Sequence, residues 1–285
     1  MLSKYFTNLI TLILPKKPRI LLIRKKCYNE SMIVVSDFDN TLYPHANIPQ
    51  FQANLNMVQK FRQSGNLFCL ASGRNISSLT RIWPEYEQYL DYIILENGAT
   101  CLNNDGKLLF QYSIEKSIAQ SICQTISDNF PNSTAFVYYY KAKEWPNLDC
   151  DVTKLRCWAA DSMVGEKILQ NVKSEYSDLV QLFLEKHAQI TSVDWIIEPT
   201  RYHAFIDIMS IEAGKANAIK RLDSSSFSKL ATRTITIGDD TNDIDMLKRY
   251  DGYAVKAAVP EVIASIKPGH IVNSVAELLQ SIMSE

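Results

Sequence analysis

The sequence predicts an α/β protein with a doubly wound, mainly parallel sheet that is interrupted by an inserted α+β domain. The first observation is that short apolar runs alternate with helical patterns over residues 32–98. The second is a change to hairpin-like patterns over residues 99–202, and the third is the return of the first rhythm over residues 203–285. Alternating strands and helices specify a parallel sheet, whereas hairpins specify an antiparallel one.

The first part of the core begins with Met32–Val35, an apolar and largely β-branched run that is typical of a buried strand. The next expected elements are a helix over 50–63, a strand over 66–71, a helix over 75–82 and a strand over 92–95. Apolar residues recur at helical spacing in the first helix, and Gly65 supplies its stop signal. Strand, helix, strand, helix and strand in this order predict a doubly wound sheet.

The insert over 99–202 opens with a hairpin signal, because two apolar runs flank Asn103-Asn104-Asp105-Gly106. Helices are expected over 114–130 and 165–174, a loop over 145–151, and strands over 134–140, 155–159, 180–184 and 193–197. The core pattern is expected to resume with strands over 205–209, 234–237, 252–255 and 271–272, and with helices over 214–222, after 243, 262–266 and 275–283.

Composition excludes several classes of protein. The chain has 285 residues, of which 46% are hydrophobic and 21% charged, and a net charge of −1, so no nucleic-acid partner is expected. None of the six cysteines forms a C-x-x-C pair, so we expect neither a zinc nor a redox site. Buried free thiols are expected at Cys69 and Cys101, which fits a reducing, cytoplasmic compartment.

Residues 1–31 differ from the rest as a basic, partly apolar leader. Residues 1–26 carry seven Lys or Arg and no acid, and the apolar run over 5–14 is too short to cross a bilayer. One interpretation is weak, peripheral association with the inner face of a membrane. The other is a loosely ordered leader, or an upstream start before a chain that begins at Met32.

Polar residues follow the predicted core strands at the points where these strands end. Asp37 and Asp39 follow the first strand, Ser72 follows the second, and Asp239, Asn242 and Asp243 follow a later one, while Lys215 lies near the start of a core helix. Any one cluster has an alternative interpretation as a helix cap. Because parallel strands end at the same edge of a sheet, we expect these residues to lie together.

Several carboxylates at one edge repel one another unless a cation lies between them. Carboxylate oxygens together with water are the ligands that Mg²⁺ prefers. A lysine and a serine hydroxyl next to a helix start suit a phosphate group. A carboxylate in line with phosphorus can attack it once the repulsion between the two anions is offset.

These residues resemble the four motifs of the haloacid dehalogenase-like (HAD) superfamily. The matching positions are Asp37-Phe38-Asp39-Asn40-Thr41, Ser72, Lys215 and Gly238-Asp239-Asp240-Thr241-Asn242-Asp243. Glu96-Asn97-Gly98-Ala99 before a large insert is similar to the Cof-type branch, which includes sucrose-phosphate, trehalose-phosphate and mannosylphosphoglycerate phosphatases. The resemblance implies a Rossmann-like core with a large α/β cap, and Asn40 departs from it where glycine is common.

The resemblance also implies roles in the first two motifs. Asp37 would be the nucleophile and a magnesium ligand. Asp39 would be the general acid and base, with its backbone carbonyl on the metal. Thr41 would order the loop and belong to the phosphate site, where Ser72 would bind the phosphoryl oxygens.

In the last two motifs, Lys215 would neutralise Asp37 and the phosphate, and Asp239 would bind magnesium directly. Asp243, with Asn242, would hold the water shell of the metal or Lys215. Asp240 is expected to be a solvated or outer-shell acid. The insert would be the cap that excludes water and selects the substrate.

Weaker candidates lie elsewhere. Arg201 and His203 have two interpretations of equal weight: substrate contacts in the cleft between cap and core, or residues of the hinge surface. His45 has two interpretations, an approach to the site from the loop after the nucleophile or, as the favoured one, a position on the surface of that loop. An aromatic group in the insert, expected mainly as core or cap surface, is a weaker candidate for a sugar-stacking wall. It comprises Tyr138, Tyr139, Tyr140, Trp145 and Trp158.

The function expected from the resemblance is a Mg²⁺-dependent phosphatase that acts on a small phosphorylated metabolite, and the branch favours a phosphosugar or polyol phosphate. The alternative enzyme is a phosphohexomutase of the same fold. An alternative of another class is a non-catalytic scaffold tethered to a membrane by the leader.

Overall fold

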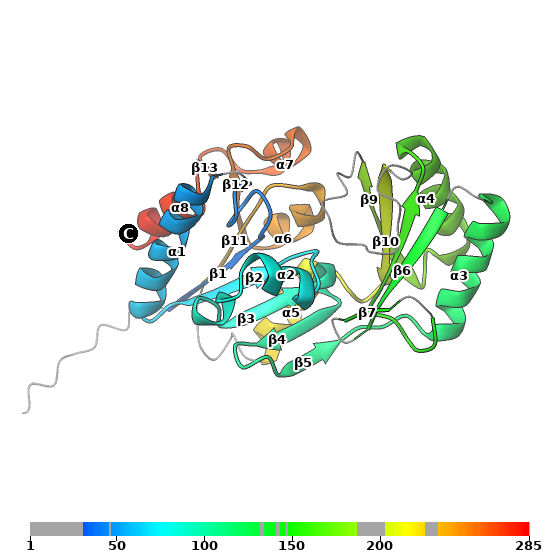
Figure 1. Cartoon of the computed structure of the whole chain (residues 1–285). Coiled ribbons are helices and arrows are strands. Elements are labelled where there is room, and N and C mark those ends of the chain that lie inside the picture. The colour runs from blue at the N-terminus through cyan, green and yellow to red at the C-terminus, as the bar shows by residue number, and fades with distance from the viewer. Residues whose placement is uncertain are drawn as a thin grey trace, which may run out of the picture.

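The computed structural model describes residues 31–45, 47–131, 134–140, 143–145, 148–186, 203–225 and 233–284. These residues form two sheets that lie side by side, each with its own helices (Figure 1). The α/β class with a mainly parallel core sheet and a second, smaller sheet is confirmed. Residues 1–30 of the leader lie outside the described residues.

The first sheet has eight strands in the order β13-β12-β11-β1-β2-β3-β4-β5. The strands are β1 (Met32–Ser36), β2 (Leu67–Ala71), β3 (Tyr92–Leu95), β4 (Thr100–Asn103), β5 (Leu108–Gln111), β11 (Arg233–Gly238), β12 (Asp251–Val255) and β13 (Ile271–Val272). From β13 to β3 all pairs are parallel, and β4 and β5 extend the sheet by antiparallel pairing. Because β1 lies in the interior of this order, its carboxyl end opens onto the middle of one edge of the sheet.

Helices cover both faces of this sheet, as a doubly wound fold requires. They are α1 (Ile48–Gln63), α2 (Ile76–Ile82), α5 (Lys215–Ser225), α6 (Ile244–Arg249), α7 (Pro260–Ser265) and α8 (Val275–Ile282). Alternate side chains of β1 point to opposite faces. Val34 belongs to the cluster formed with α1, α2 and α8, whereas Ile33 and Val35 belong to the cluster formed with α5, α6 and α7.

The second sheet has five strands in the order β7-β6-β8-β10-β9, and its paired strands are antiparallel. Its elements are β6 (Thr134–Tyr140), β7 (Lys143–Trp145), β8 (Lys154–Ala159), β9 (Val180–Lys186), β10 (Ala204–Ser210), α3 (Lys116–Asn129) and α4 (Ser162–Tyr176). Leu155 and Cys157 of β8 pack with both helices in one core cluster. The alternate residues Lys154, Arg156 and Trp158 therefore lie on the other face of the sheet.

Two segments belong to a different sheet from the one expected from the domain boundaries at residues 99 and 203. The hairpin β4–β5 was expected in the insert, but it extends the first sheet because Glu96, Asn97 and Gly98 reverse the chain after β3, with φ angles of 53°, 53° and 98°. Strand β10 was expected in the core, but it pairs with β8 and β9 of the second sheet. A hairpin pattern specifies antiparallel pairing without specifying the sheet that it joins.

Two further details concern the insert. The loop expected from Trp145 onward is partly wrong, because Trp145 pairs with Tyr138 in the hairpin β6–β7. The strand expected over 193–197 lies outside the described residues. All cysteines that the structure describes are free, and Cys69 and Cys101 are buried as expected.

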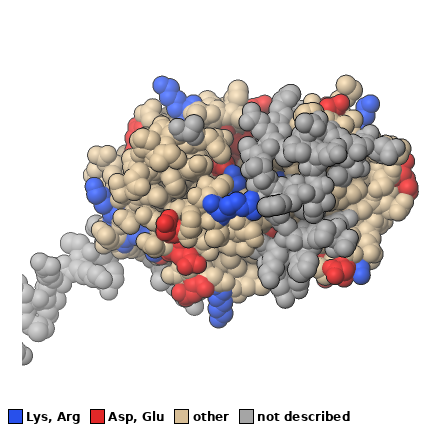
Figure 2. Space-filling model, viewed as in Figure 1, with Lys and Arg blue, Asp and Glu red and all other residues tan. Residues whose placement is uncertain are grey.

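The surface agrees with the near-zero net charge. Charged side chains are scattered over the visible face of the described part, without a continuous basic patch (Figure 2). In the same part of the chain, we find no helix with the length and apolarity needed to cross a membrane.

Candidate active site

Strand β1 delivers Asp37 to the edge of the sheet, and the loop after it is fixed by backbone bonds and packing. The Asp37 amide donates to the Ile237 carbonyl at 2.9 Å, which continues the pairing of β1 with β11. Phe38 is fully buried, and its ring stacks on Trp83 with centroids 5.9 Å apart. Asn40 has a φ of 57°, a conformation that asparagine adopts more easily than most residues. The loop thus turns at Asn40 while Phe38 anchors it.

Lys215 lies between two carboxylates. It is the first residue of α5, and its Nζ is 2.6 Å from Asp37 Oδ1 and 2.6 Å from Asp243 Oδ1. All three residues are buried. Burial alone would lower the pKa of Lys215, but Asp243 and Asp37 outweigh it and raise that pKa above its ordinary value. Lys215 is therefore a permanent positive charge beside Asp37.

Asp243 orients its neighbours and uses both carboxylate oxygens to do so. While Oδ1 accepts from Lys215, Oδ2 accepts from the backbone amides of Asp239 at 3.0 Å and Asp240 at 3.2 Å. Asp240 caps the short 3₁₀ turn η4 (Thr241–Asp243) by accepting from the Thr241 amide at 2.6 Å. Asp243 therefore holds Lys215 and the chain at Asp239.

Asp239 completes the acidic cluster. Its Oδ1 accepts a hydrogen bond from the Thr41 hydroxyl at 2.7 Å, which joins the loop after β1 to the loop after β11. Asp37, Asp239 and Asp243 each offer a carboxylate oxygen, and these oxygens lie within 4.8 Å of one another. Such a cluster of buried carboxylates has the donor chemistry of a site for a hard divalent cation.

The cluster fits a cation best between Asp37 and Asp239. Both oxygens of Asp243 are engaged, whereas in the described part of the chain no hydrogen bond involves Oδ2 of Asp37 or Asp239. Burial raises the pKa of Asp37 despite the opposing charge of Lys215, and the neighbouring carboxylates add to that rise. Burial also raises the pKa of Asp239 to about 7, against the hydrogen bond from Thr41. A cation there would offset this repulsion.

Ser72 and Arg74 face the same edge from the loop after β2. Ser72 is fully buried, and its hydroxyl oxygen accepts from the Arg74 amide at 3.1 Å. The Arg74 guanidinium donates from Nε to Asp39 Oδ2 and from Nη2 to Asp39 Oδ1, each at 2.7 Å. Arg74 Nη1 also donates to the Ser78 hydroxyl at 2.8 Å, which fixes the guanidinium on α2.

Arg74 was not among the predicted site residues, whereas His45 lies on the loop surface and also approaches the site. His45 Nε2 is 3.2 Å from Asp39 Oδ1, so it contacts the site although half of its side chain is exposed. Burial favours a high pKa for Asp39, but the hydrogen bonds from His45 and Arg74 outweigh it and lower that pKa. The one available signal for Arg74 was its place two residues after Ser72, at the same end of β2.

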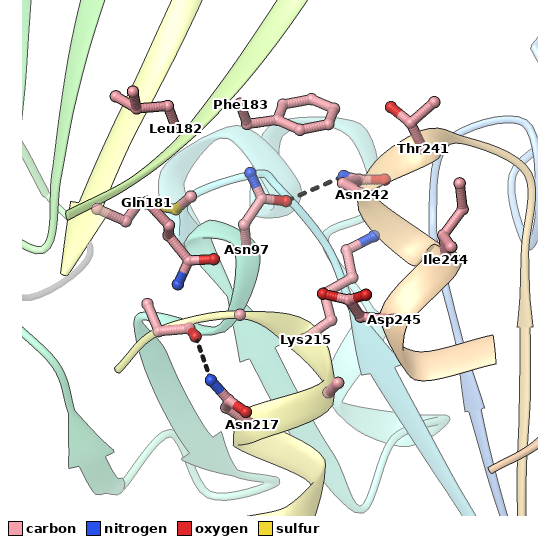
Figure 3. Close-up of a pocket in the computed structure, with 14 residues that line it drawn as sticks. Asn97, Gln181, Leu182, Phe183, Lys215, Asn217, Thr241, Asn242, Ile244 and Asp245 are labelled. Carbon is pink, nitrogen blue, oxygen red and sulfur yellow. Dashed lines mark hydrogen bonds between the residues drawn. The ribbon is translucent and has the colours of Figure 1, made fainter. Parts of the chain in front are cut away.

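A cavity of about 310 Å³ adjoins Lys215 and extends to the second sheet (Figure 3). Asn242 lines it and donates from Nδ2 to Asn97 Oδ1 at 3.0 Å. The buried Oδ1 of Asn242 has no hydrogen-bond partner among the described residues. Gln181 and Phe183 of β9 line the cavity from the side of the second sheet (Figure 3). The cavity thus offers amide groups and an aromatic ring beside the buried lysine.

The candidates in the insert lie in different places. Arg201 lies outside the described residues. His203 is exposed, and its backbone amide donates to the Ala159 carbonyl at 3.1 Å, which joins it to the second sheet. Trp158 is buried against Phe205, with ring centroids 5.2 Å apart. Tyr139 is buried beneath the ammonium group of Lys154.

Comparison with known proteins agrees with this arrangement. The family model described as "haloacid dehalogenase-like hydrolase" matches residues 34–277. The chain belongs to the haloacid dehalogenase-like hydrolases. The family expected from the motifs is thus confirmed. Among curated relatives of this HAD-like hydrolase, an uncharacterized protein of Mycoplasma capricolum subsp. capricolum is 24% identical over 266 residues, which cover 85% of this chain and 97% of the relative.

Solved structures with a similar fold include three that cover nearly the whole chain. A HAD/COF-like hydrolase from Plasmodium vivax has a TM-score of 0.68 at 16% identity and covers 90% of this chain and 96% of its own. The HAD phosphatase BT1666 from Bacteroides thetaiotaomicron has a TM-score of 0.65 at 16% identity, with coverages of 93% and 98%. The HAD subclass IIB sugar phosphatase BT4131 has a TM-score of 0.62 at 14% identity, with coverages of 89% and 98%.

Proposed function

We propose that this hydrolase is a Mg²⁺-dependent phosphatase that cleaves a small phosphomonoester through an aspartyl-phosphate on Asp37. The observation that carries the proposal is the position of Lys215 Nζ, 2.6 Å from both Asp37 and Asp243 in a buried site. An anionic nucleophile attacks an anionic phosphate readily only when fixed positive charge offsets their repulsion. Lys215 supplies that charge beside one oxygen of Asp37.

In the first step, the free carboxylate oxygen of Asp37 attacks phosphorus and the bond to the leaving oxygen breaks. Asp39 then protonates the leaving oxygen, which departs as an alcohol. In the second step, Asp39 takes a proton from water, and the resulting hydroxide attacks phosphorus and releases phosphate from Asp37. Ser72 and Lys215 bind the phosphoryl oxygens throughout.

Asp37, Asp239 and the backbone carbonyl of Asp39 would hold Mg²⁺. Asp243, with Asn242, would hold the water shell of the ion or Lys215. The ion would supply charge stabilisation to the phosphoryl oxygens. Thr41 orients Asp239 by donating to its Oδ1. Asp243 keeps Lys215 directed at Asp37, because its other oxygen is fixed by two backbone amides.

Two observations support a phosphosugar or polyol phosphate as substrate. The cavity beside Lys215 is lined by the side-chain amides of Asn97, Gln181 and Asn242 and by the ring of Phe183. Amides pair well with hydroxyl groups, and an aromatic ring packs on the apolar face of a sugar. BT4131, which shares the fold, is described as a sugar phosphatase.

The test is phosphate release from a panel of sugar, polyol and nucleotide monophosphates, with Mg²⁺ or with a chelator. We expect release from at least one sugar or polyol phosphate, only with Mg²⁺, and none from the Asp37→Asn variant. Absence of release from every compound by the wild-type chain would overturn the proposal. Transfer of the phosphoryl group between hydroxyls of one hexose, without net release, would favour the mutase.

A further inference from the structure

The loop that carries Ser72 and Arg74 is held at three consecutive backbone carbonyls. The amide of Asn97 donates to the Ser72 carbonyl at 3.0 Å, and the amide of Glu96 donates to the Arg74 carbonyl at 3.0 Å. Between them, Lys154 Nζ donates to the Gly73 carbonyl at 2.9 Å. The first two donors belong to the turn after β3 in the first sheet. The third comes from β8 of the second sheet, so the two sheets meet at this loop.

Lys154 is a buried charged residue, and its burial is favourable only when its ammonium group has partners. Its residue exposure is 1%, its ammonium lies 4.4 Å from the centroid of the Tyr139 ring, and Asp207 Oδ2 is 3.4 Å away. An ammonium taken out of water costs several kcal/mol unless its donors are satisfied. A neutral residue would fill the same space without that cost, but it would neither donate to the Gly73 carbonyl nor pair with Asp207.

Asp207 keeps a cationic partner when Lys154 is removed. Arg156 donates to Asp207 from Nε at 2.6 Å and from Nη2 at 2.8 Å, which is the strong bidentate geometry. Removing the ammonium of Lys154 therefore leaves Asp207 paired. The Gly73 carbonyl loses its donor, and the buried Glu96 carboxylate loses a nearby positive charge.

The Gly73 loop has little freedom to move while these contacts are present. A Cβ built on Gly73 would lie 2.9 Å from Asn97 Oδ1, so the loop is pressed against the turn after β3. The same loop places the Ser72 hydroxyl and directs Arg74 to Asp39. A shift at Gly73 would displace both of these groups.

We propose that Lys154 is a positioning residue that couples docking of the second sheet to phosphate binding by the Ser72 loop. The proposal rests on the proposed function, because it gives that loop a phosphoryl group to bind. Lys154 touches the backbone of the loop and acts through Ser72. Coupling of this kind is reciprocal, so bound phosphate strengthens the docking of the second sheet onto the loop.

The variant Lys154→Met tests the coupling because methionine keeps the unbranched chain and loses the donor. Binding of inorganic phosphate is measured by calorimetry with saturating Mg²⁺, on the full chain. We expect the Kd for phosphate to rise about ten-fold, which is the loss of one hydrogen bond from a charged donor. The Kd for Mg²⁺ alone is expected to differ from that of the wild type by less than about two-fold, because Asp37 and Asp239 do not contact Lys154.

Two controls separate positioning from general damage. Lys167→Met makes the same chemical change on the exposed surface of α4. Ile168→Val removes a methylene from the fully buried core on the second sheet without touching the loop. Both are expected to bind phosphate as the wild type does, although Ile168→Val unfolds at a lower temperature.

A second variant keeps the test decisive if Lys154→Met does not fold. Lys154→Gln keeps an N–H donor on a shorter side chain and should raise the Kd for phosphate by about three-fold. A folded variant that binds phosphate with wild-type affinity would overturn the role of Lys154. A wild-type chain that neither binds phosphate nor releases it from any ester would instead overturn the proposed function.

Discussion

Arg74 binds the carboxylate of Asp39 through two parallel hydrogen bonds, from Nε to Oδ2 and from Nη2 to Oδ1, each at 2.7 Å. With His45 it holds the pKa of Asp39 below the usual value, although burial acts in the opposite direction. Asp39 is therefore ionised in this arrangement, which suits the base that activates water. To act as the acid, Asp39 has to gain a proton while substrate is bound.

Replacing Arg74 with glutamine tests this relationship. Without the guanidinium, the remaining effect of burial raises the pKa of Asp39, so the limb of the kcat–pH profile that reports Asp39 should move to higher pH. We expect kcat/KM at neutral pH to fall by about ten-fold or more, because a bidentate charged contact is lost. Arg81→Gln, on the exposed end of α2, is the matched control. An unchanged pH profile would contradict the role assigned to Arg74.

Lys215→Met should cost both activity and stability. It leaves Asp37 and Asp243 buried without their cation, and breaking a buried ion pair from one side costs about 3–5 kcal/mol. Added Mg²⁺ should restore part of the lost unfolding temperature, because the ion would offset the same carboxylates. Lys220→Met, exposed on the same helix, should change neither property. Equal unfolding temperatures for the two variants would rule out this electrostatic account.

A substitution in the turn after β3 tests the close approach of two backbone segments. Gly98 has a φ of 98°, and a Cβ there would lie 2.3 Å from the backbone of Gly214, just before Lys215. We expect Gly98→Ala to lower the free energy of unfolding by more than about 2 kcal/mol. Gly106→Ala is the control, because Gly106 has a φ of 73° but open space around it, and should cost only about 1 kcal/mol. Urea denaturation measures both, and similar losses would show that the contact with Gly214 is unimportant.

Asp207→Asn gives a stability difference that depends on pH. Burial favours a high pKa for Asp207, but Arg156 and Lys154 outweigh it and lower that pKa from 3.8. A lowered pKa means that the native state is stabilised above the unfolded-state value and loses this stabilisation as the pH falls through the native pKa. At pH 7 we expect the variant to be less stable by about 3 kcal/mol, because the buried Lys154 and the half-buried Arg156 lose their anionic partner.

The measurement for Asp207 is the free energy of unfolding of wild type and variant at pH 7 and at acid pH. The difference should shrink as the pH falls from about 4, where Asp207 of the unfolded chain takes up a proton, through the lower native pKa of Asp207. Asp128→Asn on the exposed face of α3 is the control and should show no such difference. A difference that is independent of pH would mean that the charge of Asp207 does not stabilise the fold.

The sequence was informative about the core because its signals were local and repeated. Buried runs such as Met32–Val35 marked the parallel strands, and parallel strands end at one edge, where Asp37, Lys215 and Asp239 lie together. Their catalytic roles stay predictions. The signals were weaker for the hairpin β4–β5, since its pattern specified the pairing mode but not the sheet.

Contacts between side chains that are far apart along the chain could not be predicted from the sequence. Arg74 and Asp39 are 35 residues apart, and a single arginine after a strand is ordinarily a solvated surface group. Lys154 lies just before the strand expected over 155–159 and was not singled out, because its burial depends on the second sheet facing the Ser72 loop. Such contacts depend on the placement of whole elements, which apolar periodicity does not encode.

The most direct test of the central claim is phosphate release by Asp37→Asn and wild type, measured with Mg²⁺ on the best substrate of the panel. Asparagine keeps the size of the side chain and removes the attacking carboxylate. We predict a fold similar to wild type and a loss of kcat of at least about a thousand-fold, as expected for a nucleophile. Turnover by the folded variant at a rate close to wild type would contradict the account.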